Sequence, residues 1–162
     1  MNAAILDATL TLAPELDVAT WLNSDTPIAL GSLRGRVVVI EAFQMLCPGC
    51  VAHGIPQAQR IAALYSTAEV AVIGLHTVFE HHEVQGTREA LAAFIHENRV
   101  SFPVGIDRSS SRIPATMAAY GMQGTPTLIL IDQLGRVRSH HFGSVPDLQI
   151  GSEIGMLRAP AS

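Results

Sequence analysis

The sequence predicts an α/β fold in which helices cover both faces of a mixed central sheet. The first observation is a continuous β-branched run, Val37 to Ile40, which is typical of a strand buried on both faces. The second is the helical spacing of apolar residues from Pro48 to about Tyr65. The third is a pair of short apolar-rich segments, Thr127 to Ile131 and Val137 to Phe142, joined by the turn Asp132-Gln133-Leu134-Gly135. Strands that alternate with helices and end in a hairpin imply a sheet with both parallel and antiparallel pairs.

The N-terminal half supplies the first elements in order. Leu12 to Leu33 reads as an irregular extension with one or two short strands, because prolines and a glycine interrupt its apolar runs. Arg36 to Phe43 is the first buried strand, and Pro56 predicts a kink in the helix that follows. Val70 to Leu75 is the second buried strand, and Phe79 to Gly86 is a polar loop.

The C-terminal half continues the alternation. Thr87 caps a helix that runs to about Asn98, with its apolar residues facing inward (Leu91, Phe94, Ile95). Val104 to Ile106 is a short strand, and Ser111 to Tyr120 is a short helix that Gly121 ends. Asp147 to Leu157 is a closing helix.

Length and composition favour a single packed domain. The chain has 162 residues, of which 48% are hydrophobic and 15% charged, so a globule with a sizeable core is expected rather than disorder. We expect one domain over residues 1–162, with an N-terminal extension (1–34), a core (35–145) and a C-terminal helix and tail (146–162). The net charge of −4 leaves no basic footprint for nucleic acid.

The N-terminal residues and the length of the apolar runs indicate the cellular compartment of the protein. No apolar run reaches the roughly 18–20 residues that a membrane span needs, so no membrane partner is expected. Met1 to Leu12 carries no positive charge before its apolar residues, which argues against a secretory signal. The sequence therefore predicts a cytoplasmic protein, or a periplasmic one if a signal has been removed. The oligomeric state stays open.

The two cysteines of the chain lie together in Cys47-Pro48-Gly49-Cys50. A disulfide over so short a loop restrains the unfolded chain little, so the spacing favours reactivity over a structural role. A buried strand leads into Cys47 and a helix begins at Pro48, so free backbone N–H groups and the helix dipole favour the thiolate of Cys47. Pro48 suits the first helical turn and Gly49 leaves the sulfur open, so both are assigned to substrate binding.

The position of the two thiols predicts a division of labour. Cys47 attacks a substrate disulfide, and Cys50, one turn further into the helix, resolves the mixed disulfide. The alternatives are two ordinary buried cysteines or a metal knuckle, which needs two more ligands from the histidines of the chain (His53, His76, His81, His82). No metal and no cofactor are expected.

Glu41 lies in the apolar strand, six residues before Cys47. A carboxylate there is costly unless it is protonated, solvated or paired. One interpretation is a proton acceptor for the Cys50 thiol, and the other is a strand-end acid that reaches solvent. Thr125-Pro126 stands directly before a strand, where either a cis peptide bond or a plain turn fits.

Taken together, these motifs resemble the thioredoxin superfamily, in particular its redoxin and TlpA-like branch, which includes the alkyl hydroperoxide reductase and thiol-specific antioxidant group. The resemblance rests on the CPGC motif after a buried strand and on Gly124-Thr125-Pro126-Thr127. It also rests on the approach from Leu30 to Val39 and on the hairpin from Asp132 to Val137, and it covers about Ala13 to Phe142. The chain differs in carrying Leu46 where thioredoxins have Trp, Pro-Gly between the cysteines, and no Lys.

This resemblance implies a thioredoxin fold and a thiol–disulfide oxidoreductase that reduces protein disulfides. Cys47 would be the nucleophile, Cys50 the resolving cysteine and Glu41 the buried acid. Pro126 would be the cis-proline that faces the dithiol, and Thr125 would offer its backbone to an extended substrate segment by strand addition. The expected partners are proteins that carry a disulfide or a dithiol.

Three other functions stay open on the sequence. A peroxiredoxin needs Thr three residues before its cysteine and Pro four residues before that Thr, and here these positions hold Gln44 and Ile40. A non-enzymatic binding module would have no need of both sulfurs. A redox sensor would use the Cys47–Cys50 bond as a switch.

Overall fold

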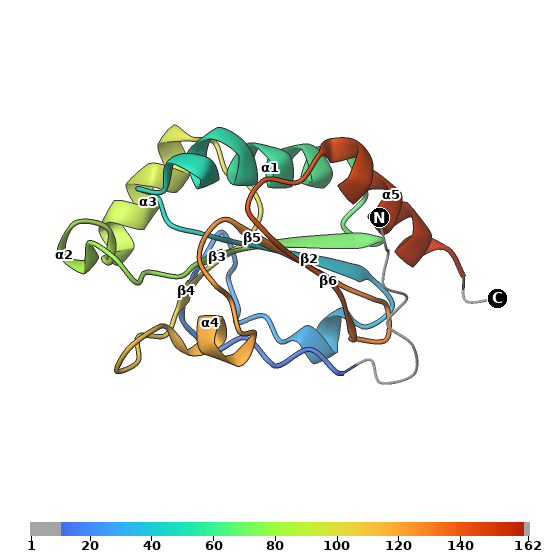
Figure 1. Cartoon of the computed structure of the whole chain (residues 1–162), viewed down its shortest axis with the longest axis horizontal. Helices are drawn as coiled ribbons and strands as arrows, with labels where there is room; N and C mark the ends of the chain where they lie inside the picture. The colour runs from blue at the N-terminus through green and yellow to red at the C-terminus, as the bar shows by residue number, and fades with distance from the viewer. Residues whose placement is uncertain (1–10, 161–162) are drawn as a thin grey trace.

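The computed structural model describes residues 11–160 and contains one six-stranded sheet in the order β1-β4-β3-β2-β5-β6 (Figure 1). The strands are β1 (Val18–Leu22), β2 (Val37–Phe43), β3 (Val70–His76), β4 (Val104–Asp107), β5 (Thr127–Ile131) and β6 (Val137–Phe142). The helices are α1 (Ile55–Leu64), α2 (His82–Gln85), α3 (Arg88–Glu97), α4 (Ala115–Ala119) and α5 (Asp147–Arg158), with a 3₁₀ turn η1 (Leu30–Leu33) and a π-helical segment η2 (Cys50–Gly54).

The register of the central strands sets the position of the dithiol. β2 runs parallel to β3 and antiparallel to β5, and β3 runs parallel to β4. Phe43 at the end of β2 pairs with His76, and Ala42 pairs with Thr127 at the start of β5. The segments that leave β2 and β3 and the segment that enters β5 therefore meet at one edge of the sheet.

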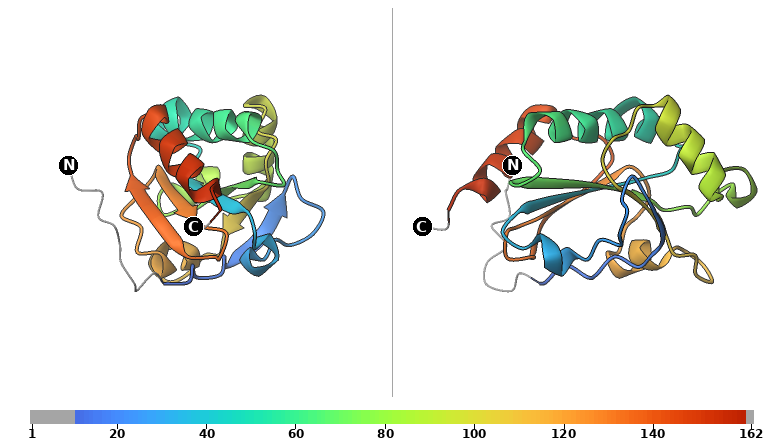
Figure 2. Two further views of the ribbon diagram at one scale, coloured as in Figure 1. Left: turned by 90° about the vertical axis from the view of Figure 1, so that its right-hand side faces the viewer. Right: turned by 180° about the vertical axis from the view of Figure 1, so that it is seen from behind.

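Helices cover both faces of the sheet, as the sequence predicts (Figures 1 and 2). α1, α3 and α5 lie on one face, where their buried side chains pack on alternate residues of β2 (Val37, Val39, Phe43). α4 and η1 lie on the other face, against the intervening residues (Val38, Ile40, Ala42). All seven residues of β2 are buried, as expected of a central strand covered on both sides. No helix within residues 11–160 is long and apolar enough to cross a membrane.

The N-terminal extension contributes a strand to the sheet, in agreement with the prediction of one or two short strands between Leu12 and Leu33. β1 pairs antiparallel with β4, and Leu16, Leu22 and Leu30 are buried. The part of the extension before Thr11 lies outside the described residues. β1 is an edge strand with one buried residue, so its apolar pattern is weaker than that of the central strands.

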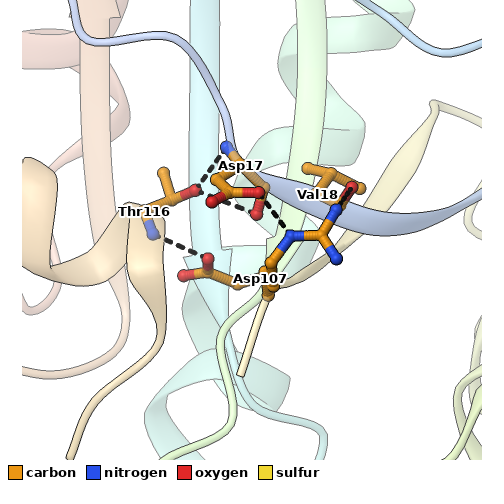
Figure 3. A network of polar contacts seen from close by, with 5 residues as sticks. Asp17, Val18, Asp107 and Thr116 are labelled. Carbon is orange, nitrogen blue, oxygen red and sulfur yellow. Dashed lines mark hydrogen bonds and ion pairs between the residues drawn. The ribbon is translucent and has the colours of Figure 1, made fainter. Parts of the chain in front are cut away.

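Hydrogen bonds connect the residue before β1 to α4 (Figure 3). The backbone N–H of Asp17 donates to the hydroxyl of Thr116 at 2.9 Å. The buried carboxylate of Asp107 accepts the N–H groups of Thr116 and Met117 in the first turn of α4. Asp107 thus binds the free N–H groups at a helix N-terminus and joins β4, α4 and the segment before β1.

The helix after the dithiol is irregular at the place where Pro56 predicts a kink. Cys50 to Gly54 form a π turn, in which the N–H of Ile55 donates to the carbonyl of Cys50. Pro56 has no N–H to donate, so it sits at the start of the regular α1, where none is needed. The irregularity therefore falls in the turn that carries Cys50 and Gly54.

Two short elements differ from the sequence prediction. The predicted polar loop Phe79 to Gly86 contains α2, whose four residues are too few for a helical pattern to show. The predicted helix Ser111 to Tyr120 begins only at Ala115, because Pro114 disfavours helical backbone before it. The cap at Thr87 is confirmed, since its hydroxyl accepts the N–H of Ala90 at 3.1 Å.

Candidate active site

The two cysteines lie at the start of the helix, and both are free thiols. Cys47 is half-buried, whereas Cys50 is fully buried. The backbone N–H of Cys50 donates to the sulfur of Cys47 at 3.3 Å, and this sulfur lies 3.5 Å from the carbonyl oxygen of Thr125. The more exposed of the two sulfurs therefore lies between a backbone N–H of the dithiol helix and a carbonyl oxygen of the Thr125–Pro126 segment.

The Cys50 thiol has a raised pKa. Burial, followed by its hydrogen bond with Cys47, raises the pKa of the Cys50 thiol to about 12. At neutral pH Cys50 therefore stays protonated until a base removes its proton. Any reaction in which Cys50 acts as a nucleophile needs a proton acceptor at this site.

The Thr125–Pro126 segment faces the dithiol from the start of β5. Its peptide bond is cis, and Pro126 packs so close to Gly49 that a β-carbon there would lie 3.3 Å from the proline ring. The carbonyl of Pro126 accepts the N–H of Gly143 at 2.9 Å, and the hydroxyl of Thr127 donates to the carbonyl of Gly124. These bonds fix the loop to the segment after β6 and to itself, and the packing of Pro126 near Gly49 is its contact with the dithiol helix.

Glu41 is the buried acid beneath this arrangement. It is 1% exposed, and its Oε1 atom has no hydrogen-bond partner among the described residues. Burial, and secondarily the charge of Cys47, raises the pKa of Glu41 well above its ordinary value. The expectation that Glu41 reaches solvent at the strand end is wrong, because both neighbouring strands and the dithiol helix enclose it.

A small cavity of about 200 Å³ adjoins the carboxyl group of Glu41. Its wall includes residues of the dithiol helix, the cis-proline loop and the start of α5 (His53, Gly54, Gln57, Pro126, Asp147). A cavity of this size with polar walls can hold water.

Sequence reasoning missed three buried polar residues around the loop before Cys47, namely Gln44, His76 and Gln85. The oxygen of Gln44 accepts the N–H groups of Phe79 and Glu80, and the Nε2 of His76 accepts the N–H of Met45 at 3.3 Å. In the sequence, Gln44 stands out only as the position where a peroxiredoxin has Thr, and His76 only as a possible metal ligand. The signal that could have found the set is the presence of polar residues at the ends of two buried strands and in the loop between them.

The structure does not gather the histidines into a metal site. Among residues 11–160, no group of three or more histidine, cysteine or acidic side chains is placed to hold a metal ion. His53 is exposed on the dithiol helix, and His81 and His82 are exposed at the start of α2.

Comparison with known proteins shows which family has this fold and site. The Redoxin family model matches residues 11–152, which is most of the chain. The chain belongs to the Redoxin family. The thioredoxin superfamily resemblance and the predicted thioredoxin fold are confirmed by this match and by solved structures of the same shape.

Two solved structures resemble this Redoxin protein over nearly its whole length. One is the thioredoxin-like superfamily protein SPOA0173, which is 56% identical, with a TM-score of 0.90 over 93% of this chain and 98% of that chain. The other is a thiol-disulfide isomerase from Corynebacterium glutamicum, which is 49% identical, with a TM-score of 0.89 over 94% of this chain and 99% of that chain. The predicted class of enzyme, a thioredoxin-like oxidoreductase, is confirmed by the likeness to the thiol-disulfide isomerase.

A curated relative is much longer. Protein DipZ of Mycobacterium bovis is 35% identical over 135 residues, which cover 81% of this chain but 18% of DipZ. The Redoxin chain therefore spans about a fifth of the length of this relative. The likeness concerns that part of DipZ alone.

Proposed function

We propose that this Redoxin protein reduces disulfides of protein substrates through Cys47 and Cys50. The observation that carries the proposal is the asymmetric pair of thiols: Cys47 is accessible and receives an N–H at its sulfur, whereas Cys50 is buried and protonated. Cys47 is therefore the nucleophile in this proposal, and Cys50 is the resolving thiol that reacts in the second step. The names of its oxidoreductase relatives suggest proteins that carry a disulfide or a dithiol as partners, and the chain acts as one thioredoxin-like domain.

In the first step, the thiolate of Cys47 attacks one sulfur of a substrate disulfide. A new bond forms between Cys47 and that sulfur, the substrate S–S bond breaks, and the other substrate sulfur leaves as a thiolate that takes a proton from water. Thr125 and Pro126 flank the attacking sulfur, with Pro48 and Gly49 beside it, and form the surface on which the substrate segment lies.

In the second step, Cys50 loses its proton and attacks the sulfur of Cys47. The Cys47–substrate bond breaks and the second substrate sulfur leaves, so the substrate gains two electrons and the enzyme holds a Cys47–Cys50 disulfide. Glu41 accepts the Cys50 proton. Burial raises the pKa of both groups, which keeps the carboxylate a stronger base than an exposed glutamate and suited to a thiol of high pKa.

Single replacements of the cysteines test this function. With a disulfide-containing protein substrate, Cys50→Ser is expected to accumulate a covalent mixed disulfide, which non-reducing electrophoresis and mass spectrometry detect. Cys47→Ser is expected to form none and to lose turnover. Equal residual turnover in the two variants, or a mixed disulfide through Cys50 in the Cys47→Ser variant, would contradict the assignment.

The predicted location remains a prediction. The sequence favours the cytoplasm, or the periplasm after removal of a signal. Cell fractionation of the natural host, with an antibody against the chain, distinguishes the two compartments.

A further inference from the structure

The loop that presents Cys47 is held by side chains from outside the dithiol helix. Gln44, Met45 and Leu46 connect the end of β2 to Cys47, and they contribute no strand or helix hydrogen bonds of their own. The N–H of Met45 donates to the Nε2 of His76 at 3.3 Å, and the N–H of Leu46 donates to the Oε1 of Gln85 at 3.1 Å. The N–H of Cys47 itself donates to the carbonyl of Gln44 at 3.1 Å.

Gln85 connects this loop to α2. It is 1% exposed, although it is the last residue of a four-residue helix whose other residues are exposed. Its amide nitrogen donates to the side-chain oxygen of Gln44 at 3.2 Å and to the carbonyl of Glu80 at 2.7 Å. Gln85 thus uses both of its donors and an acceptor, and each partner is in one of the two loops at this edge of the sheet.

The side chain of Gln44 forms the other half of the connection. Its oxygen accepts from the N–H groups of Phe79 and Glu80 as well as from Gln85. The two amide side chains are themselves buried, so disrupting the bond between them is costly because it leaves buried polar groups unpaired. The loop before Cys47 and the segment from Phe79 to Gln85 therefore move as one unit.

We propose that Gln85 is a positioning residue, which holds the backbone before Cys47 so that the Cys47 sulfur stays in contact with the N–H of Cys50 and the carbonyl of Thr125. The inference rests on the proposed role of Cys47 as nucleophile. Gln85 touches neither sulfur nor substrate. It acts through Leu46 and Gln44, and its removal lowers the rate at which Cys47 reacts without removing either thiol.

The first experiment replaces the hydrogen-bonding amide with an apolar side chain of similar shape. Gln85→Met is compared with Glu83→Met, a matched control on an exposed position of the same helix. We expect Gln85→Met to slow the reaction of Cys47 with iodoacetamide and with a disulfide substrate by about tenfold. Of the three hydrogen bonds that this substitution removes, the one from the N–H of Leu46 acts directly on the backbone before Cys47. The drop is expected in kcat/KM for a small disulfide as well as for a protein disulfide, and Glu83→Met is expected to react like the unchanged protein.

A second variant separates positioning from a general loss of stability. Gln85→Glu keeps the acceptor for Leu46 but can donate to Gln44 only when its carboxyl group is protonated. The groups around it are the buried His76, held neutral, and the exposed Glu80, His81 and His82. The rate of Gln85→Glu relative to the unchanged protein is therefore expected to recover as the pH is lowered from about 8 to about 5.

The outcomes decide the proposal in either direction. Should Gln85→Met react with iodoacetamide as fast as Glu83→Met, the positioning role is wrong. Should Gln85→Met fail to fold by circular dichroism, the pH dependence of Gln85→Glu decides, and a pH-independent rate ratio overturns the proposal. Cys47→Ser, measured alongside, distinguishes the failures: an inactive Cys47→Ser with a normal Gln85→Met removes only the role of Gln85, whereas an active Cys47→Ser removes the proposed function.

Discussion

The Oε1 atom of Glu41 lies against the backbone of Gly54, so closely that a β-carbon at position 54 would overlap it. The same β-carbon would lie 3.0 Å from the Cβ atom of Pro126. Gly54 stands in the π turn of the dithiol helix, and its missing side chain is what lets the buried carboxyl group and the cis-proline approach this turn. Glu41, Gly54 of the dithiol helix and Pro126 are therefore packed directly against one another.

Gly54→Ala is expected to destabilise the protein by about 1–3 kcal/mol and to reduce turnover, because overpacking forces Glu41 or Pro126 to move. The measurement is urea unfolding together with a disulfide-reduction assay. Gly151→Ala in α5 is the control, since a β-carbon there meets no atom within 4 Å and alanine favours a helix by up to about 1 kcal/mol. Equal stability of the two variants would show that the turn has room for a methyl group.

The raised pKa of Glu41 predicts how stability changes with pH. The folded state binds the carboxyl proton more tightly than the unfolded state, so this group's contribution is greatest below about pH 4.5 and falls as the pH rises toward the folded-state pKa. Glu41→Gln cannot ionise, so its stability relative to the unchanged protein is expected to increase with pH from about 4.5 up to the folded-state pKa and then to level off. Urea unfolding at a series of pH values measures the difference, and a difference independent of pH would contradict a raised pKa for this buried acid.

The same variant tests the catalytic role of Glu41. If Glu41 accepts the Cys50 proton, Glu41→Gln slows release of the mixed disulfide and leaves its formation by Cys47 nearly unchanged. Stopped-flow or quenched-flow analysis of the two steps separates them. An equal loss in both steps would assign Glu41 to structure rather than proton transfer.

His76 predicts a pH dependence of the opposite sign. Burial lowers its pKa from 6.5 to about 4, and a hydrogen bond with Gln85 offsets this only in part. Between these values the unfolded chain binds more protons, so stability rises with pH from about 4 to about 6.5 and then levels off, by up to about 3 kcal/mol. His76→Gln retains an acceptor for Met45 but does not titrate, so its stability is expected to change less across this range. Matching pH slopes for the two proteins would mean that His76 is not held neutral.

The two thiols are expected to differ sharply in alkylation. With a pKa of about 12, only about one Cys50 side chain in 10⁵ is ionised at neutral pH, and Cys50 is also fully buried. Iodoacetamide at neutral pH should therefore modify Cys47 alone in the reduced, folded protein, as peptide mass spectrometry can show. In urea both cysteines should react, which serves as the control, and modification of Cys50 at a similar rate in the folded protein would overturn the asymmetry.

Peroxide should be a poor substrate. The position three residues before Cys47 holds Gln44, whose oxygen is occupied by the N–H groups of Phe79 and Glu80 and by Gln85. No hydroxyl is present there to hold a peroxide oxygen. We expect negligible consumption of hydrogen peroxide under conditions in which protein disulfides are reduced, and turnover at a comparable rate would favour the peroxiredoxin alternative.

The sequence alone was sufficient for the features that depend on local pattern. The β-branched run of β2, the hairpin of β5 and β6, the cap at Thr87 and the CPGC motif at a helix start are all short-range signals, and each lies where the sequence predicts. These signals identify the fold because strand burial, helix capping and turn chemistry are set by neighbouring residues.

Tertiary structure decided what depends on residues far apart in the chain. The sequence could not show that Glu41 is enclosed rather than solvated, that Gly54 makes room for it, or that Gln85 is buried within a polar loop. Each of these facts arises where strand pairing brings the ends of β2 and β3 and the start of β5 to one edge of the sheet. A polar side chain is predicted to be exposed from the sequence. Only the hydrogen-bond partners that the fold supplies can offset the free-energy cost of burying it.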